Sequence, residues 1–197
     1  QRNALLKNSD DRNVDISLLE IYNEKLIEPA EYIYNSRKQF IGDLKPFFEK
    51  AYKAISNKKE VFSIHYESGL AKNNIKQLFK NSFAKDSILK RTTEGIHKDD
   101  LVFMMANFKV KQYSSQGQQK TFLMALKLAQ YFYLKEKLAK PTFFIIDDIF
   151  DKLDTERSKN LINFVCDNQN QVFISHTSKE MLEKELKEVD FQLIEIK

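Results

Sequence analysis

The sequence has little of the residues that mark low-complexity and disulfide-rich proteins. Its 197 residues include only four glycines and three prolines, which excludes a collagen-like or linker-like chain. Its one cysteine, Cys166, excludes an internal disulfide. Because Cys166 lies in an apolar helical stretch with no nearby histidine, we interpret it as a buried thiol in a reducing cytoplasm, not as a nucleophile. No apolar run approaches the roughly 18 residues that span a bilayer, so we expect a cytoplasmic protein with no membrane partner.

Two further features are missing from the sequence. The chain begins at Gln1 without a signal peptide, so we expect it to be processed or to be a piece of a longer protein. The pattern GxxxxGK[ST] of a phosphate-binding loop is absent, and none of Gly42, Gly69, Gly95 and Gly117 is placed to form one.

The composition is that of a globular chain with one domain or two small ones, since 42% of the residues are hydrophobic and 30% are charged. The net charge of +4 is spread unevenly: −2 over residues 1–49, +7 over 50–111 and −1 over 112–197. A basic middle section is typical of a DNA-binding surface, for which Lys72, Lys76 and Lys80 are the candidates. The alternative is a solvated, lysine-rich helix face.

Apolar periodicity predicts a helical first part. Residues 15–52 have apolar residues at three- and four-residue steps, and Pro29 and Pro46 should divide or bend that helix. The next elements are a half-buried strand over 61–67, a helix over 70–84, and two strands over 101–107 and 109–113.

The remainder of the chain alternates helices with apolar strands. A long helix follows the polar turn 114–120, and the later elements are strands over 142–146, 172–175 and 191–196, a helix over 154–165, and a helix begun by the capping box Thr177-x-x-Glu180. Buried strands that alternate with helices predict parallel βα units and an α/β fold.

The sharpest candidate site is FFIIDDIFDKLD, residues 143–154. Asp147 and Asp148 would emerge at the carboxyl end of a buried strand, where open α/β sheets bind ligands. One carboxylate could hold Mg²⁺ and its neighbour could activate a water for attack on a γ-phosphate, as in a Walker-B motif. The alternatives are two solvated acids, or the D-D-x-x-D diphosphate motif of isoprenoid synthases completed by Asp151, although that motif lies on a helix.

Two weaker candidates lie at the start of a helix and at the end of a strand. In SSQGQQK, residues 114–120, Ser115 offers a hydroxyl and Gly117 allows close backbone approach to a phosphate at a helix start. The segment ends 27 residues before Asp147, the order of an ABC-type signature and Walker B. His176 directly follows a buried strand, as does the γ-phosphate-sensing histidine of ABC-type ATPases. The simpler interpretations are a helix cap and a structural histidine.

Five segments together resemble the RecF family of bacterial repair proteins over almost the whole chain: QRNALLK (1–7), RKQFIGDL (37–44), TTEGIHKDDL (92–101), SSQGQQKTFLMALKLAQ (114–130) and FFIIDDIFDKLD (143–154). The resemblance implies a two-lobed, SMC-like ATPase head that binds DNA, ATP and Mg²⁺. It also implies dimerisation on ATP and action with RecO and RecR in gap repair.

The resemblance assigns roles by position. Ser115, Gly117 and Gln118 fall in the signature motif, which contacts ATP in trans. Asp147 is the Mg²⁺-side acid, Asp148 the catalytic acid and His176 the switch residue, while Asp151, Leu153 and Asp154 fall in the D-loop. Ile96 and Lys98 depart from the family's GPHRDD pattern, and Asp151-Lys152 replaces the more usual Ser-Glu.

We therefore predict an α/β chain that is the C-terminal part of an ABC-type ATPase head with a helical subdomain. Residues 1–90 would form a helical lobe with a short strand, and residues 91–197 the head portion that carries the motifs. The intact protein would be a slow ATPase in DNA repair, recombination, replication and the SOS response, whereas this chain alone should be inactive without a P-loop. The alternatives are a non-catalytic DNA- or protein-binding lobe with degenerate motifs, and an SMC-like ATPase outside DNA repair.

Overall fold

The computed structural model describes residues 1–8, 14–56, 61–138, 142–147, 153–167, 171–187 and 189–195. The chain forms two compact units. The first contains Gln1–Gly42 and Ile64–Val102, and the second contains Asp43–Ser63 and Phe103–Lys197. These boundaries differ from the division at residue 90 that the sequence suggested.

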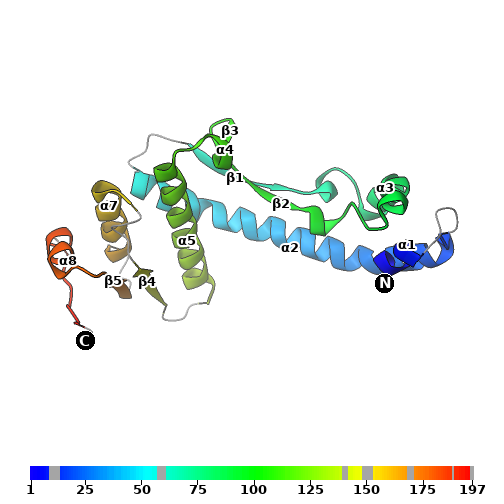
Figure 1. Cartoon of the computed structure of the whole chain (residues 1–197). Helices are drawn as coiled ribbons and strands as arrows, with labels where there is room; N and C mark the ends of the chain where they lie inside the picture. The colour runs from blue at the N-terminus through cyan, green and yellow to red at the C-terminus, as the bar shows by residue number, and fades with distance from the viewer. Residues whose placement is uncertain are drawn as a thin grey trace. The chain divides into compact units, whose positions relative to one another are not determined.

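The longest helix, α2 (Ile16–Ser56), runs through both prolines without a break (Figure 1). Of the two outcomes predicted for Pro29 and Pro46, a divided helix or one bent helix, the division is therefore wrong. A proline inside a helix removes one hydrogen bond and crowds the carbonyl four residues earlier. Both prolines are exposed, so water can solvate the freed carbonyls, while Ala30 and Phe48 remain buried.

The first unit packs α1 (Arg2–Asn8) and the start of α2 with α3 (Ile75–Leu89). Its apolar core contains Ala30, Ile75, Leu78 and Phe79. The helix predicted over 70–84 begins later than expected, because a short 3-10 turn, η1 (Gly69–Ala71), comes first. Asn74 then caps α3 by accepting a hydrogen bond from the backbone N–H of Gln77 at 2.9 Å.

Three strands form a small sheet in the order β1 (Phe62–Glu67), β2 (Asp100–Met105) and β3 (Phe108–Lys109). β1 confirms the predicted strand over 61–67, and His65 is exposed on it. β2 and β3 pair antiparallel, with Met105 opposite Phe108.

The second strand of this hairpin is much shorter than predicted. Residues 110–113 form a helical turn, α4 (Val110–Tyr113), and Val110 is buried while Lys111 is exposed. Four residues are too few to distinguish the period of a helix from that of a strand.

An aromatic core holds the second unit together. Phe122 of α5 (Gln116–Leu138) lies 4.9 Å from Phe48 and from Phe103, and 5.5 Å from Phe62, between ring centroids. Such aromatic pairs favour tilted and edge-on contacts at these separations. The predicted long helix after the polar turn is therefore confirmed, and its apolar side fixes it in this unit.

β4 (Phe143–Asp147) and β5 (Gln171–Ser175) pair in parallel, which confirms the expected parallel arrangement (Figure 1). Tyr131 of α5 contacts Phe144 with ring centroids 5.2 Å apart. The prediction of fully buried strands is wrong for these residues, because Ile145 is 65% and Phe173 is 46% exposed. A run of apolar residues identifies the strand but does not show whether both faces are covered.

The last elements are α7 (Thr155–Cys166) and α8 (Lys179–Glu185). α7 confirms the predicted helix over 154–165. The N-cap of α8 is Ser178, not Thr177, since the Ser178 side chain accepts a hydrogen bond from the N–H of Met181. The predicted strand over 191–196 is absent from its described residues, 191–195. No helix in the described part of the chain is both long and apolar enough to cross a membrane.

Candidate functional site

The register of β4 and β5 brings two of the predicted motifs together. Asp147 is the last residue of β4, and its partner in the parallel pair is Ser175, the last residue of β5. The Ser175 hydroxyl donates a hydrogen bond to Oδ1 of Asp147. His176 follows Ser175 directly, so Asp147 and His176, the predicted Walker-B acid and the predicted switch residue, follow the same edge of the sheet. Sequence reasoning missed Ser175, because the sequence does not show that β4 pairs with β5 in this register.

The acidic segment after Asp147 is described only in part. Asp148 and Asp151, predicted as the catalytic acid and the start of the D-loop, lie outside the described residues. Leu153 is 7% exposed and Asp154 is exposed. Asp154 caps α7 by accepting a hydrogen bond from the N–H of Arg157 at 2.9 Å, so its carboxylate faces the positive end of that helix.

The predicted signature segment, residues 114–120, forms a reciprocal cap at the start of α5. The N–H of Gln118 donates to Ser115 Oγ at 3.2 Å, and the N–H of Ser115 donates to Gln118 Oε1 at 2.7 Å. This is a capping box, in which both side chains satisfy backbone donors that the helix leaves free. Ser115 and Gly117 are exposed, so the first turn of the helix is accessible.

Arg157 joins the start of α7 to the start of α5. Its Nη1 donates to Thr121 Oγ1 at 3.0 Å, and Thr121 Oγ1 in turn donates to the carbonyl oxygen of Gly117 at 2.9 Å. A Cβ atom at position 117 would lie 3.2 Å from Arg157 Nη1. Glycine at this position therefore leaves room for the guanidinium. Sequence reasoning missed Arg157, since its partner is 36 residues away.

The three candidate DNA-binding lysines lie in the first unit and are exposed. Lys72 ends the η1 turn, and Lys76 and Lys80 lie one helical turn apart on α3. Lys76 and Lys80 also line a hollow of about 560 Å³, with Phe79 and Phe83. Lys76 and Lys80 thus share one surface, as an electrostatic contact with DNA would require.

The turn GIHKDD, residues 95–100, is held in place by the buried carboxylate of Asp99. The side chain of Asp99 is 2% exposed, accepts a hydrogen bond from the Tyr66 hydroxyl, and lies 3.4 Å from Arg37 Nη1. Burial raises the pKa of Tyr66 above 10.0, and the hydrogen bond to Asp99 raises this pKa further. Tyr66 therefore stays protonated and remains a donor. Gly95 permits the turn, because its φ of 127° is disfavoured for other residues.

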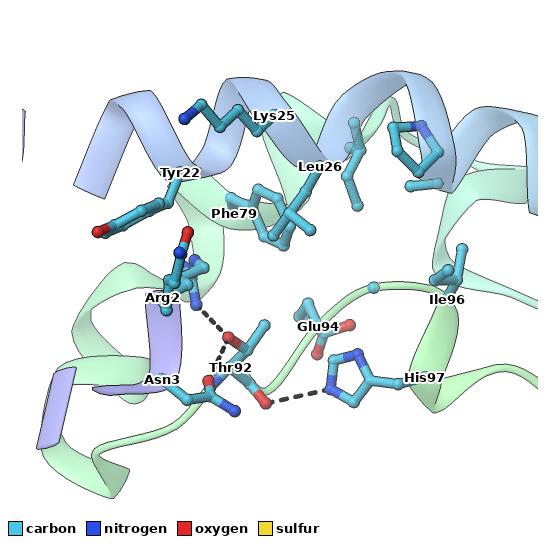
Figure 2. Close-up of a pocket in the computed structure, with 15 residues that line it drawn as sticks. Arg2, Asn3, Tyr22, Lys25, Leu26, Phe79, Thr92, Glu94, Ile96 and His97 are labelled. Carbon is cyan, nitrogen blue, oxygen red and sulfur yellow. Dashed lines mark hydrogen bonds between the residues drawn. The ribbon is translucent and has the colours of Figure 1, made fainter. Parts of the chain in front are cut away.

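A cavity of about 370 Å³ lies beside this turn in the first unit (Figure 2). α2 contributes Tyr22, Lys25 and Leu26 to its wall, facing the segment that carries Thr92 and His97. His97 Nε2 lies 3.2 Å from the carbonyl oxygen of Thr92, which holds the ring at the rim.

A buried ion pair ties the wall of this cavity together. Arg2 Nη2 donates to Asp86 Oδ2 at 2.8 Å, and the two side chains are 4% and 0% exposed. Arg2 also donates to Asn23 Oδ1 and Thr92 Oγ1, at 2.7 and 2.6 Å (Figure 2 shows the bond to Thr92). Asp86 Oδ1 accepts hydrogen bonds from both the N–H and the hydroxyl of Thr93. The charges are thus paired and hydrogen-bonded, as burial requires.

Cys166 is the last residue of α7 and is partly buried. Burial raises the pKa of its thiol above 9.0, and the nearby Asp167 raises the pKa further. The thiol is therefore protonated at neutral pH, in agreement with a structural role and against a nucleophilic one.

Comparisons with known proteins give a consistent result. No family model matches the chain. The DNA replication and repair protein RecF of Cytophaga hutchinsonii is 43% identical over 166 residues, which are 84% of this chain and 44% of that protein. The protein of the same name from Bacteroides fragilis is 36% identical over 199 residues, 100% of this chain and 53% of its own length.

A solved structure of the recombination mediator protein RecF with ATP, from the RecFOR pathway, matches 90% of this chain and 49% of its own chain. The match has a TM-score of 0.75 at 30% sequence identity. The class of protein is therefore an α/β chain with the fold of part of an ABC-type ATPase head. The resemblance to the RecF family is confirmed, and the chain spans about half the length of the curated relatives it matches.

Proposed function

We propose that this chain is the motif-bearing C-terminal portion of a RecF-type protein, which binds ATP and DNA in recombinational repair. The intact protein would dimerise on ATP, hydrolyse it slowly, and act at gapped DNA with partners of the RecO and RecR type. The proposal is supported by the names of the relatives, and by the solved RecF structure with ATP.

One structural observation carries this proposal. Asp147 pairs with Ser175 at the carboxyl ends of two neighbouring parallel strands, and His176 follows Ser175 in the sequence. This arrangement supports the assignment of Asp147 as the Walker-B acid and of His176 as the switch residue. Ligands of open α/β sheets bind at this edge. Asp148, the next residue after Asp147, would orient or deprotonate the attacking water, and His176 would contact the γ-phosphate.

The donor groups at this edge suit Mg²⁺. Among the described residues, no three His, Cys, Asp or Glu side chains converge as a metal site. Mg²⁺ does not need such a cluster, since it is bound through one or two carboxylates, phosphate oxygens and water. Asp147 would hold the ion, with its carboxylate oriented by the Ser175 hydroxyl. The ion would neutralise charge on the phosphates.

The test of this proposal is the change Ser115→Arg in a protein of the full length of the relatives. In an ATP-bound dimer the signature of one subunit covers the ATP of the other, so a bulky cation would have to be buried in the closed interface. We expect ATP binding by the monomer to be retained and ATP-driven dimerisation to be lost, as measured by sedimentation with and without ATP.

Ser178→Arg is the matched control, because Ser178 also caps a helix and accepts a backbone hydrogen bond. Loss of either cap should cost about 1 kcal/mol of stability, but only Ser115→Arg should block dimerisation. Dimerisation of Ser115→Arg at the wild-type ATP concentration would favour the non-catalytic alternative, in which Ser115 is only a cap.

The DNA-binding part of the proposal predicts an effect of charge reversal. Replacing Lys72, Lys76 and Lys80 with glutamate in the full-length protein should weaken DNA binding and flatten its dependence on salt, since fewer counterions are released. Fluorescence anisotropy across a range of salt concentrations measures both quantities. Reversal of three other exposed lysines, Lys53, Lys127 and Lys187, changes the net charge equally. Equal weakening by both triple changes would mean that the first surface has no special role.

A further inference from the structure

The hydrogen bonds of Arg157 form a directed chain between two motifs. The guanidinium donates to Thr121 Oγ1, and the Thr121 hydroxyl uses its one hydrogen to donate to the Gly117 carbonyl. At its other side, Arg157 Nε lies 3.4 Å from Asp154 Oδ2. One side chain thus contacts the acid that caps α7 and, through a hydroxyl, the exposed first turn of α5.

The burial of the residues around Arg157 strengthens these hydrogen bonds. Thr121 is fully buried, so water cannot readily replace Arg157 as the hydrogen-bond donor to its hydroxyl. Loss of that donor would leave a buried polar group without its partner. The Arg157 side chain is 25% exposed, so the contact is partly shielded from solvent. Hydrogen bonds from a charged donor are also stronger than those between neutral groups.

We propose that Arg157 is a positioning residue, which holds the signature turn at Gly117 and the D-loop acid Asp154 in a fixed relation. This inference rests on the proposed function, because it assigns both segments to an ATP site completed by a second subunit. The Ser115–Gln118 cap keeps the first turn of α5 helical, whereas Arg157 sets the place of that turn against α7. Both segments must meet the partner together, so their spacing matters for closure and not for ATP binding by the monomer.

The first arm of the test needs no ATP. In the full-length protein, Arg157→Gln and Thr121→Val each break the hydrogen-bond chain at a different link. We expect both changes to speed backbone amide hydrogen exchange over residues 116–121 at least several-fold, while Arg91→Gln, at an exposed arginine of the first unit, leaves it unchanged. Unchanged exchange in the two variants would overturn the inference.

The second arm measures turnover. Arg157→Gln should lower kcat for ATP by about 10-fold to 100-fold, the range that loss of a supporting partner causes in other sites, with little change in KM. Thr121→Val should act in the same direction, and the double variant should be no slower than Arg157→Gln, since both remove one interaction. Arg157→Lys should recover part of the rate, because its single nitrogen can reach Thr121 but cannot also take the place of the Nε that lies near Asp154.

The outcomes separate the two proposals. Full turnover by Arg157→Gln, or additive losses in the double variant, would overturn the positioning role. A wild-type protein that neither dimerises on ATP nor hydrolyses it would overturn the proposed function, and the exchange measurement would still decide the structural role of Arg157. Thr121→Val keeps the test valid if Arg157→Gln fails to fold.

Discussion

Replacement of Asp148 with asparagine in a protein of the full length of the relatives is expected to slow ATP hydrolysis by about 100-fold to 10,000-fold, the usual contribution of a general base. Asparagine has the same size as aspartate but cannot accept the proton of the attacking water. ATP binding should persist, and ATP-bound dimers should accumulate because they no longer turn over. Single-turnover hydrolysis and sedimentation measure the two effects.

The neighbouring acid should respond differently. Asp147 ends β4 and accepts a hydrogen bond from the Ser175 hydroxyl, which would orient its carboxylate toward the proposed Mg²⁺. Asp147→Asn should therefore raise the Mg²⁺ concentration needed for turnover. Asp167→Asn, in an acid just after α7 and outside both motifs, is the matched control. Equal hydrolysis rates of the wild type and Asp148→Asn would remove the catalytic assignment of Asp148. If only Asp148→Asn shifted the Mg²⁺ dependence, Asp148 would be the Mg²⁺-side acid and Asp147 the catalytic acid.

Replacement of Asp86 with asparagine is expected to destabilise the protein by about 3–5 kcal/mol, the cost of leaving one charge of a buried pair without its partner. Asp86 accepts hydrogen bonds through both oxygens, from Arg2 and Ser82 on one side and from Thr93 on the other. An asparagine must turn its NH₂ group toward one of these sets of donors. Chemical denaturation followed by circular dichroism measures the loss.

Asp43→Asn provides the comparison for this prediction. Asp43 also pairs with a basic residue, Lys137, at 3.5 Å, but both side chains are solvent-accessible, at 35% and 52%. A pair of this kind contributes about 0–1 kcal/mol. If Asp86→Asn costs no more than Asp43→Asn, the buried network around Arg2 does not hold the first unit together.

Local sequence patterns predicted the parts of the fold that depend on neighbours along the chain. The helical period of α5, the β-favouring residues of β4 and the helix over 154–165 were all visible in the sequence, and the structure confirms these elements. The helical turn α4 was mistaken for a strand, because four residues are too few for a period to show.

Interactions between distant residues could not be predicted in the same way. The pair Arg2–Asp86 joins residues 84 positions apart, and the contact of Arg157 with Thr121 spans 36. The exposure of Ile145 and Phe173 depends on what covers the sheet, which an apolar run does not specify. The family resemblance assigned Ser115, Asp147 and His176, and the structure then brought Ser175 to Asp147 and Arg157 to Gly117.

The capped start of α5 also limits how two copies of the chain could meet. Ser115 Oγ accepts its hydrogen bond from Gln118, so the hydroxyl still has a hydrogen to donate, and Arg157 places a cation near Gly117. This surface is not self-complementary, because two copies of the Arg157 cation placed face to face would repel each other. In any two-fold symmetric dimer it cannot lie on the symmetry axis against its own copy, and it must face a different, acceptor-rich surface. Symmetry then repeats that contact, so such a dimer contains two equivalent, off-axis sites.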